Sequence, residues 1–396
     1  MQIGKSKADE GGGILVLDGP SAMAFYRDRD DLMSAYEEES EYDQPQVKLD
    51  RDFEDFWLSD EDVAATLAVE SVFGHKSFVG EESHELTDSP LPPLRRSTMN
   101  RMRLASSRSR DLKQVSYEEL GIRPPAKDST LYLLLPDAER RRRVTNVRQR
   151  ICRVELPSYS FLRLGDNVYV PTPELTFLLM ARYLDVHELI ALGMELCGHY
   201  RLVGASTDSL LVSNRTLYGQ SPLTTPRRIA ALLDRMEGFY GLKLARRVCP
   251  YLIADSASPM ETALYMLLCL PRNLGGYGLP RPVLNVRRRV TVLAGSFTLS
   301  KTLVPDLFWP AVMFDVEYDS EEFHASPECL LKGARRTLAL RSMNVEVVSV
   351  TKDMVYDEDL FDGLVRLVAK ALGVRLRRPT QAGELQRAIL RQVVLS

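Results

Sequence analysis

Three acidic residues stand at alternate positions in the segment DVEYDSEEFH, which covers residues 315–324. Residues two apart in a β-strand point to the same side, so Asp315, Glu317 and Asp319 would share one strand face. Three carboxylates on one face repel one another. Either a divalent cation or exposure of this face to water would offset that repulsion.

The neighbouring residues favour the cation. Asp306 follows Pro305 on the preceding strand candidate, and His324 lies just beyond the acidic strand. Carboxylates on adjacent antiparallel strands stand about 5 Å apart, a suitable gap for one Mg²⁺ or Mn²⁺ to bridge. The spacing therefore favours a divalent cation over exposure of this strand face to water.

The elements that would position these residues begin with a capping box, S-P-M-E, at residues 258–261. Ser258 can cap the helix that follows, and Glu261 can reach back toward the cap. Hydrophobic periodicity then predicts three strands, a helix, a strand and an amphipathic helix. Their expected ranges are 285–295, 300–310 and 311–320, then 327–343, 345–351 and 357–373.

This order, with P-D on one strand and E-Y-D on the next, resembles the PD-(D/E)xK nuclease core. The run LVPDLFWPAVMFDVEYDSEEFH is more closely similar to an uncharacterised family related to very-short-patch repair endonucleases. The resemblance implies an α/β protein whose C-terminal domain is a restriction-endonuclease-like mixed sheet flanked by helices. It implies Asp306 and Glu317 as metal ligands, with Asp319 close by, and hydrolysis of phosphodiester bonds as the reaction. That reaction needs a nucleophilic water and neutralisation of developing oxyanion charge, and Mg²⁺ supplies both. It also implies Glu261 as an outer ligand and His324 as an acid/base or phosphate contact.

The chain departs from that pattern in two places. Asp319 stands where active enzymes of the wider fold have a lysine, and a glycine precedes Arg335 and Arg336 where related modules place an acid. Lys301 or Lys332 could replace the missing lysine. The alternative interpretation is a nuclease fold retained for binding or scaffolding.

An upstream resemblance leads to a function of a different class. The runs ELTFLLMA, LGMELCGHY and GGYGLP are similar to the middle of proteins close to the abortive-infection type IV antitoxins. This similarity implies a non-catalytic, antitoxin-like transcriptional regulator that binds DNA or a cognate toxin. Together the two resemblances cover roughly residues 130–373.

Charge is distributed unevenly along the chain. Residues 1–90 hold 7 Lys/Arg and 23 Asp/Glu, a net charge of −16, whereas residues 91–156 hold 16 and 7, a net charge of +9. The acidic stretch 28–62 is either a solvated insertion or an arm that masks the basic segment. Arg148 and Arg150 alternate on an expected strand, which would either grip phosphates or protect a strand edge. DNA is the expected partner, with Arg335 and Arg336 as further contacts.

Length and composition are those of a globular protein, because 396 residues include 45% hydrophobic and 27% charged residues. We expect an acidic, then basic and partly disordered N-terminal region (1–128), a mixed α/β antitoxin-like middle domain (129–255) and the nuclease-like domain (256–396). The five cysteines favour reduced, buried thiols. The N-terminus lacks an apolar signal sequence, and no apolar run approaches about 20 residues.

These features predict a cytoplasmic protein without membrane association. The glycine-rich stretch NLGGYGLPRP (273–282) lacks the strand, helix and lysine of a phosphate-binding loop. No nucleotide cofactor is therefore expected.

Overall fold

The computed structural model describes residues 15–29, 95–97, 112, 115–127, 129–165, 167–203, 215–319, 327–378 and 380–395. The chain divides into two units, residues 33–90 and the remainder, and these described residues all belong to the second. They form a mixed α/β protein of small sheets and helices, as predicted. The expected acidic arm, 28–62, lies outside the described residues except for Asp28 and Arg29.

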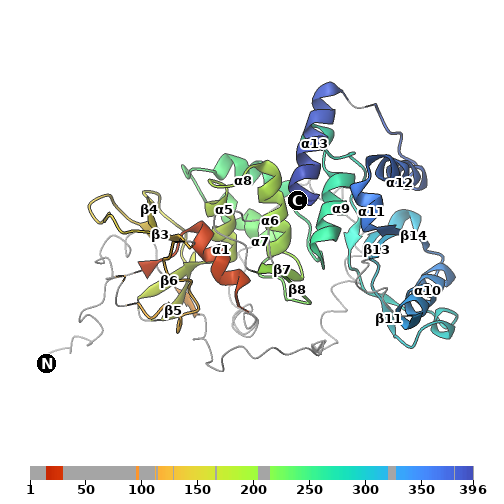
Figure 1. Ribbon diagram of the computed structural model, residues 1–396, viewed down its shortest axis with the longest axis horizontal. Coiled ribbons are helices and arrows are strands. Elements are labelled where there is room, and N and C mark those ends of the chain that lie inside the picture. Colours follow the sequence, from red (N-terminus) through yellow and green to blue (C-terminus); the bar gives the residue numbers. More distant parts are fainter. Residues whose placement is uncertain are drawn as a thin grey trace. The chain divides into compact units, whose positions relative to one another are not determined.

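The first sheet has the strand order β1-β6-β5-β2, and β1 runs parallel to β6. Its strands are β1 (Leu15–Val16), β2 (Arg95–Ser97), β5 (Phe161–Gly165) and β6 (Val168–Pro171). A parallel pair, β3 (Leu131–Leu135) and β4 (Val147–Ile151), lies beside it and contacts β1 and α1 (Gly19–Arg27) (Figure 1). The strand expected to carry Arg148 and Arg150 is confirmed as β4. Asp18 caps α1 by accepting a hydrogen bond from the Gly19 N–H at 2.9 Å.

Four helices follow, with a hairpin between the second and the third. The helices are α5 (Pro173–Met180), α6 (Val186–Leu196), α7 (Pro226–Asp234) and α8 (Leu242–Val248), and the hairpin strands are β7 (Tyr200–Val203) and β8 (Arg215–Tyr218). Thr172 caps α5, and Asp185 forms a capping box with Glu188 at the start of α6. Every residue of α5 is buried, because α1, α6, α7 and α8 pack around it. A mostly apolar sequence such as PELTFLLM is typical of such a central helix.

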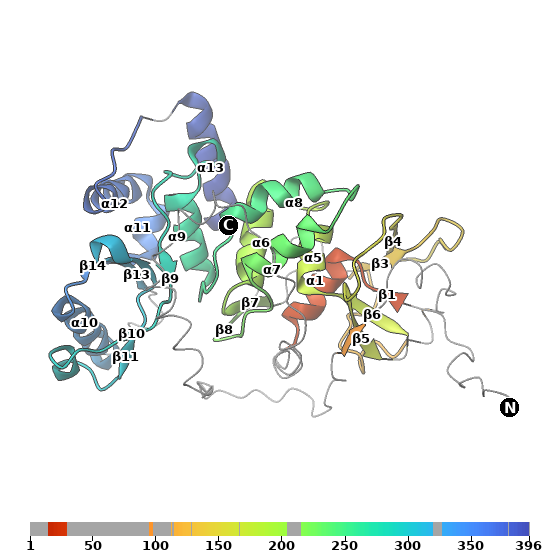
Figure 2. The ribbon, with the colours of Figure 1, turned by 180° about the vertical axis from the view of Figure 1, so that it is seen from behind.

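The C-terminal sheet has the order β14-β13-β12-β9, in which β13 and β14 are parallel and the other pairs are antiparallel. Its strands are β9 (Val283–Leu284), β12 (Leu307–Trp309), β13 (Phe314–Asp319) and β14 (Glu346–Thr351), while β10 (Arg288–Arg289) and β11 (Thr302–Leu303) form a separate pair. The helices are α9 (Pro259–Cys269), α10 (Pro327–Ser342), α11 (Lys352–Tyr356), α12 (Glu358–Ala371) and α13 (Gln381–Leu395). Figure 2 shows β13, β14 and α10 from behind.

Most of the predicted order is confirmed here, but the first predicted strand is wrong in extent. Within 285–295 only Arg288–Arg289 is extended, and it pairs with β11 rather than with the main sheet. The Thr291 hydroxyl accepts a hydrogen bond from the Ala294 N–H at 3.3 Å and starts a turn of 3₁₀ helix there. The chain therefore leaves the extended conformation after two residues. Helix α13 was not predicted.

The predicted capping box at α9 is confirmed with one difference. Ser258 accepts from the Glu261 N–H at 3.1 Å, but the Glu261 carboxylate reaches one residue further back, to the Ala257 N–H at 2.8 Å. Contacts also cross residue 255: α9 packs against α6, and the Tyr200 and Thr262 hydroxyls are 3.0 Å apart. The domain boundary at 255 therefore remains a prediction.

The glycine-rich stretch serves close packing. Gly275 has a φ of 85°, and a Cβ there would lie 2.3 Å from the Gln386 carbonyl oxygen of α13. A Cβ on Gly276 would lie 2.1 Å from the Leu270 carbonyl oxygen. Only glycine fits at both positions. In the part of the chain described, no helix is long and apolar enough to cross a membrane.

Candidate functional site

Asp306 and Glu317 face each other across β12 and β13. Leu307 pairs with Val316, so one further step of the antiparallel register sets Asp306 opposite Glu317. The Tyr318 N–H donates to Asp306 Oδ2 at 2.9 Å and holds that carboxylate against the neighbouring strand. The structure thus brings together the two residues that the sequence indicates as metal ligands.

Arg336 of α10 lies against both of these carboxylates. Its Nε and Nη2 donate to the two oxygens of Glu317 at 2.6 and 2.7 Å, and Nη2 lies 3.6 Å from Asp306 Oδ1. Nη2 also donates to the Val304 carbonyl. A bidentate guanidinium–carboxylate pair is a strong and directional interaction. Arg336, expected as a nucleic-acid contact, therefore binds the acidic cluster, while Arg335 beside it is exposed.

Asp315 lies on the same strand face and is fully buried. Neither of its oxygens has a hydrogen-bond donor within reach. Burial and, second to it, the Glu317 carboxylate beside it raise the pKa of Asp315 to about 10. A proton on Asp315 lets the two carboxyl groups share a hydrogen bond. Alternation along the strand predicted the shared face, but it did not predict that this face is covered.

The pKa values of two neighbouring carboxyl groups, those of Asp306 and Glu261, are raised as well. Burial raises the pKa of Asp306 well above its usual range, and the charges of Glu317 and Glu261 raise it further. Burial also raises the pKa of Glu261, whose oxygens accept hydrogen bonds from the Ala257 N–H, the Ser258 hydroxyl and the Asn285 amide. Glu261 thus acts on Asp306 by its charge, while both of its oxygens already meet donors.

The other residues that the sequence indicated for this site differ in position and exposure. Asp319 ends β13 and is partly buried, whereas His324 lies outside the described residues. Lys301 and Lys332 are both exposed. No group of three or more His, Cys, Asp or Glu side chains is placed to hold a metal ion in the described ranges. Asp306 and Glu317 nevertheless fit Mg²⁺, which is commonly bound by one or two carboxylates together with waters and substrate phosphates.

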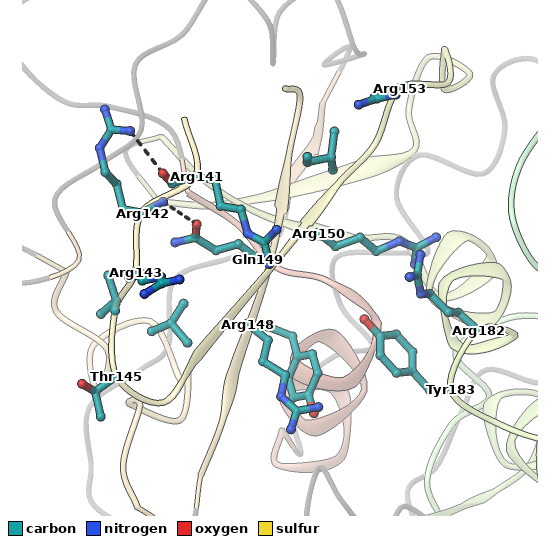
Figure 3. A pocket seen from close by; sticks show the side chains of 14 residues that line it. Arg141, Arg142, Arg143, Thr145, Arg148, Gln149, Arg150, Arg153, Arg182 and Tyr183 are labelled. Atoms are coloured by element: carbon teal, nitrogen blue, oxygen red, sulfur yellow. Dashed lines mark hydrogen bonds between the residues drawn. The ribbon is translucent and has the colours of Figure 1, made fainter. Parts of the chain in front are cut away.

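A second polar site surrounds Arg148 and Arg150 of β4. A pocket of about 850 Å³ opens beside this strand and is lined by seven arginines (Figure 3). Besides Arg148 and Arg150, the arginines are residues 141–143, Arg153 and Arg182. Sequence reasoning found the two strand arginines but missed Arg182, because only folding brings the end of α5 next to β4.

Comparisons with known proteins identify no relative of this chain: no family model, curated protein or solved structure matches it. The assignment of function therefore depends on the residues and their geometry.

Proposed function

We propose that the protein is a cytoplasmic, Mg²⁺-dependent endonuclease that hydrolyses phosphodiester bonds in DNA. This proposal rests on one observation: Asp306, just before β12, lies opposite Glu317 of β13. The helix α9, the sheet β14-β13-β12-β9 and the crossover helix α10 support a restriction-endonuclease-like domain of the PD-(D/E)xK type around it.

Asp306 and Glu317 would hold Mg²⁺ or Mn²⁺, with Glu261 behind them. When bound, such an ion makes a coordinated water nucleophilic near neutral pH and neutralises charge on the phosphate oxygens. Arg336 orients Glu317 through two hydrogen bonds and adds positive charge at the same place. On the basis of the sequence resemblance, Asp319 supports the metal site, and His324 assists proton transfer or contacts the leaving group.

Lys332 is the best placed substitute for the lysine that the acidic strand lacks. It precedes Arg336 by four residues in α10, so the two residues share one helix face. Arg336 already reaches Glu317, and the Lys332 side chain is exposed and has room to reorient.

The second candidate function is a non-catalytic, antitoxin-like regulator that binds DNA or a toxin protein. Arg336 supports it specifically, because its guanidinium contacts both oxygens of Glu317 and approaches Asp306. A resident cation of this kind balances the acidic cluster without any metal. In that case the nuclease-like domain would serve as a scaffold.

Metal-dependent stability separates the two candidates. The melting temperature of the wild type should rise with Mg²⁺ or Mn²⁺ concentration, because an ion that binds only the folded state stabilises it by mass action. Glu317→Gln keeps the shape of the side chain but removes a ligand charge, so the rise should disappear and cleavage of duplex DNA should fall by orders of magnitude. Glu346→Gln, an exposed position on β14, is the matched control and should behave as the wild type.

A metal-dependent rise without cleavage of duplex, single-stranded or RNA substrates would favour the binding function. The absence of any rise in the wild type would refute the metal site.

A further inference from the structure

The pocket beside β4 concentrates positive charge, and the described residues that line it carry no acidic side chain. Seven of its fourteen lining residues are arginines, and none is acidic. Arg143, Arg148, Arg153 and Arg182 are exposed, so their guanidinium groups can meet a ligand. Mutual repulsion between these groups is relieved when an anion with several charges binds among them.

Aromatic rings fix the direction of three of these arginines. Arg148 lies over the Tyr132 ring at 5.7 Å, Arg150 over Phe239 at 5.1 Å and Arg182 over Tyr240 at 4.9 Å. Such stacking restrains a long side chain before any ligand arrives and so reduces the entropy lost on binding.

One buried acidic residue lies behind Arg150. Asp18 lies 3.6 Å from Arg150 Nη1 and accepts a hydrogen bond from the Tyr183 hydroxyl at 2.8 Å. Arg150 Nη1 is buried and makes no hydrogen bond, so this ion pair with Asp18 holds it in place. Asp18 also caps α1, so the ion pair ties Arg150 to the body of the fold.

The arrangement suits a chain of phosphates. Arg148 and Arg150 are two residues apart on one strand, a separation of about 6.8 Å, which is the scale on which phosphates recur along a nucleic-acid backbone. Figure 3 shows the arginines spread along both sides of β4 rather than gathered at one point. Arginines spaced in this way can bind successive phosphates of a nucleic-acid backbone without recognising the base sequence.

The aromatic residues in the wall are not free to stack on bases. Arg148 covers the Tyr132 ring, and the Tyr183 ring meets Tyr132 edge-on with its hydroxyl bonded to Asp18. Single-strand binding sites normally offer open aromatic platforms. The pocket therefore favours the phosphate backbone of a duplex.

We propose that this arginine-lined pocket, formed by β4, residues 141–143 and the end of α5, binds the phosphate backbone of duplex DNA. The inference goes beyond the proposed cleavage, because the pocket is a second site whose binding does not require Asp306, Glu317 or a metal ion.

The test measures binding of the full-length protein to a labelled short duplex by fluorescence anisotropy, in EDTA and over a series of salt concentrations. Removing three exposed arginines, in Arg143→Ala/Arg148→Ala/Arg153→Ala, should make the slope of log affinity against log salt shallower by about 2.7. Affinity should fall by about tenfold or more at moderate salt. The matched control removes three exposed arginines that lie outside the pocket, on α7, α8 and α10, in Arg227→Ala/Arg247→Ala/Arg341→Ala. This control should bind as the wild type does.

Three results would overturn the proposal: an unchanged salt slope in the pocket variant, an equal loss in the control variant, or tighter binding of a single strand or a nucleoside triphosphate than of the duplex. Because the binding assay contains EDTA, no metal ion takes part in it. A failure of the proposed nuclease site would therefore leave this result unchanged.

Discussion

Replacing Asp315 with Asn should stabilise the protein, and the gain should grow with pH. Asp315 is fully buried without a hydrogen-bond donor, and burial raises its pKa to about 10. In the unfolded chain the pKa of an Asp is about 3.9. Between these two values the folded state holds a proton that the unfolded chain releases, so the free energy of unfolding falls as pH rises.

The size of the effect follows from this difference. Each pH unit above about 3.9 costs about 1.36 kcal/mol, so the penalty is about 1.5 kcal/mol at pH 5 and about 4 kcal/mol at pH 7. An Asn carries no proton to lose, and its amide can donate to the Glu317 carboxylate. Asp315→Asn should therefore exceed the wild type in stability by a margin that widens from pH 5 to pH 8.

Thermal or urea unfolding of both proteins at pH 5, 6, 7 and 8, without metal, measures this margin. Asp319→Asn is the matched control on the same strand; it is partly exposed, and its margin should stay small. A margin for Asp315→Asn that is constant with pH would refute the reasoning, since it would mean that Asp315 is charged in the folded state. A lower stability at pH 8 would refute it more strongly.

Two further predictions concern residues outside the acidic cluster. The hydrogen bond from His199 to Asp255, at 3.3 Å, raises the pKa of His199. The stability that this hydrogen bond contributes is present below about pH 6.5 and is lost as pH rises through the raised pKa. His199→Gln should therefore remove this part of the pH dependence of thermal unfolding. Gly276→Ala should lower the free energy of unfolding by about 3 kcal/mol or more, because the new Cβ would lie 2.1 Å from the Leu270 carbonyl oxygen. The control Gly363→Ala adds a Cβ that meets nothing within 4 Å, so it should not lower the free energy of unfolding. Urea denaturation measures both variants.

The sequence predicted the part of the fold that local rules determine. Alternation gave β13, periodicity gave α10 and α12, and S-P-M-E gave the start of α9. The close approach of Asp306 and Glu317 was also predicted, because carboxylates on adjacent antiparallel strands stand close together. Each of these inferences depends on residues close together in the chain.

Features that depend on tertiary placement could not be predicted. Arg336 reaches Glu317 only because the crossover helix α10 packs beside the sheet with Arg336 level with Glu317. Arg182 joins the arginine-lined pocket from an element about thirty residues further along the chain than β4. Burial of Asp315 depends on what covers the sheet, and alternation along a strand does not encode that cover.

If Asp306 and Glu317 form a metal site, anomalous diffraction from crystals soaked in Mn²⁺ will locate the ion. We expect one anomalous peak within bonding distance of both carboxylates in the wild type, with the Arg336 guanidinium turned away from Glu317. We expect no peak in Glu317→Gln. A wild-type map in which Arg336 still binds Glu317 through both oxygens and no peak lies beside Asp306 would rule out the metal site.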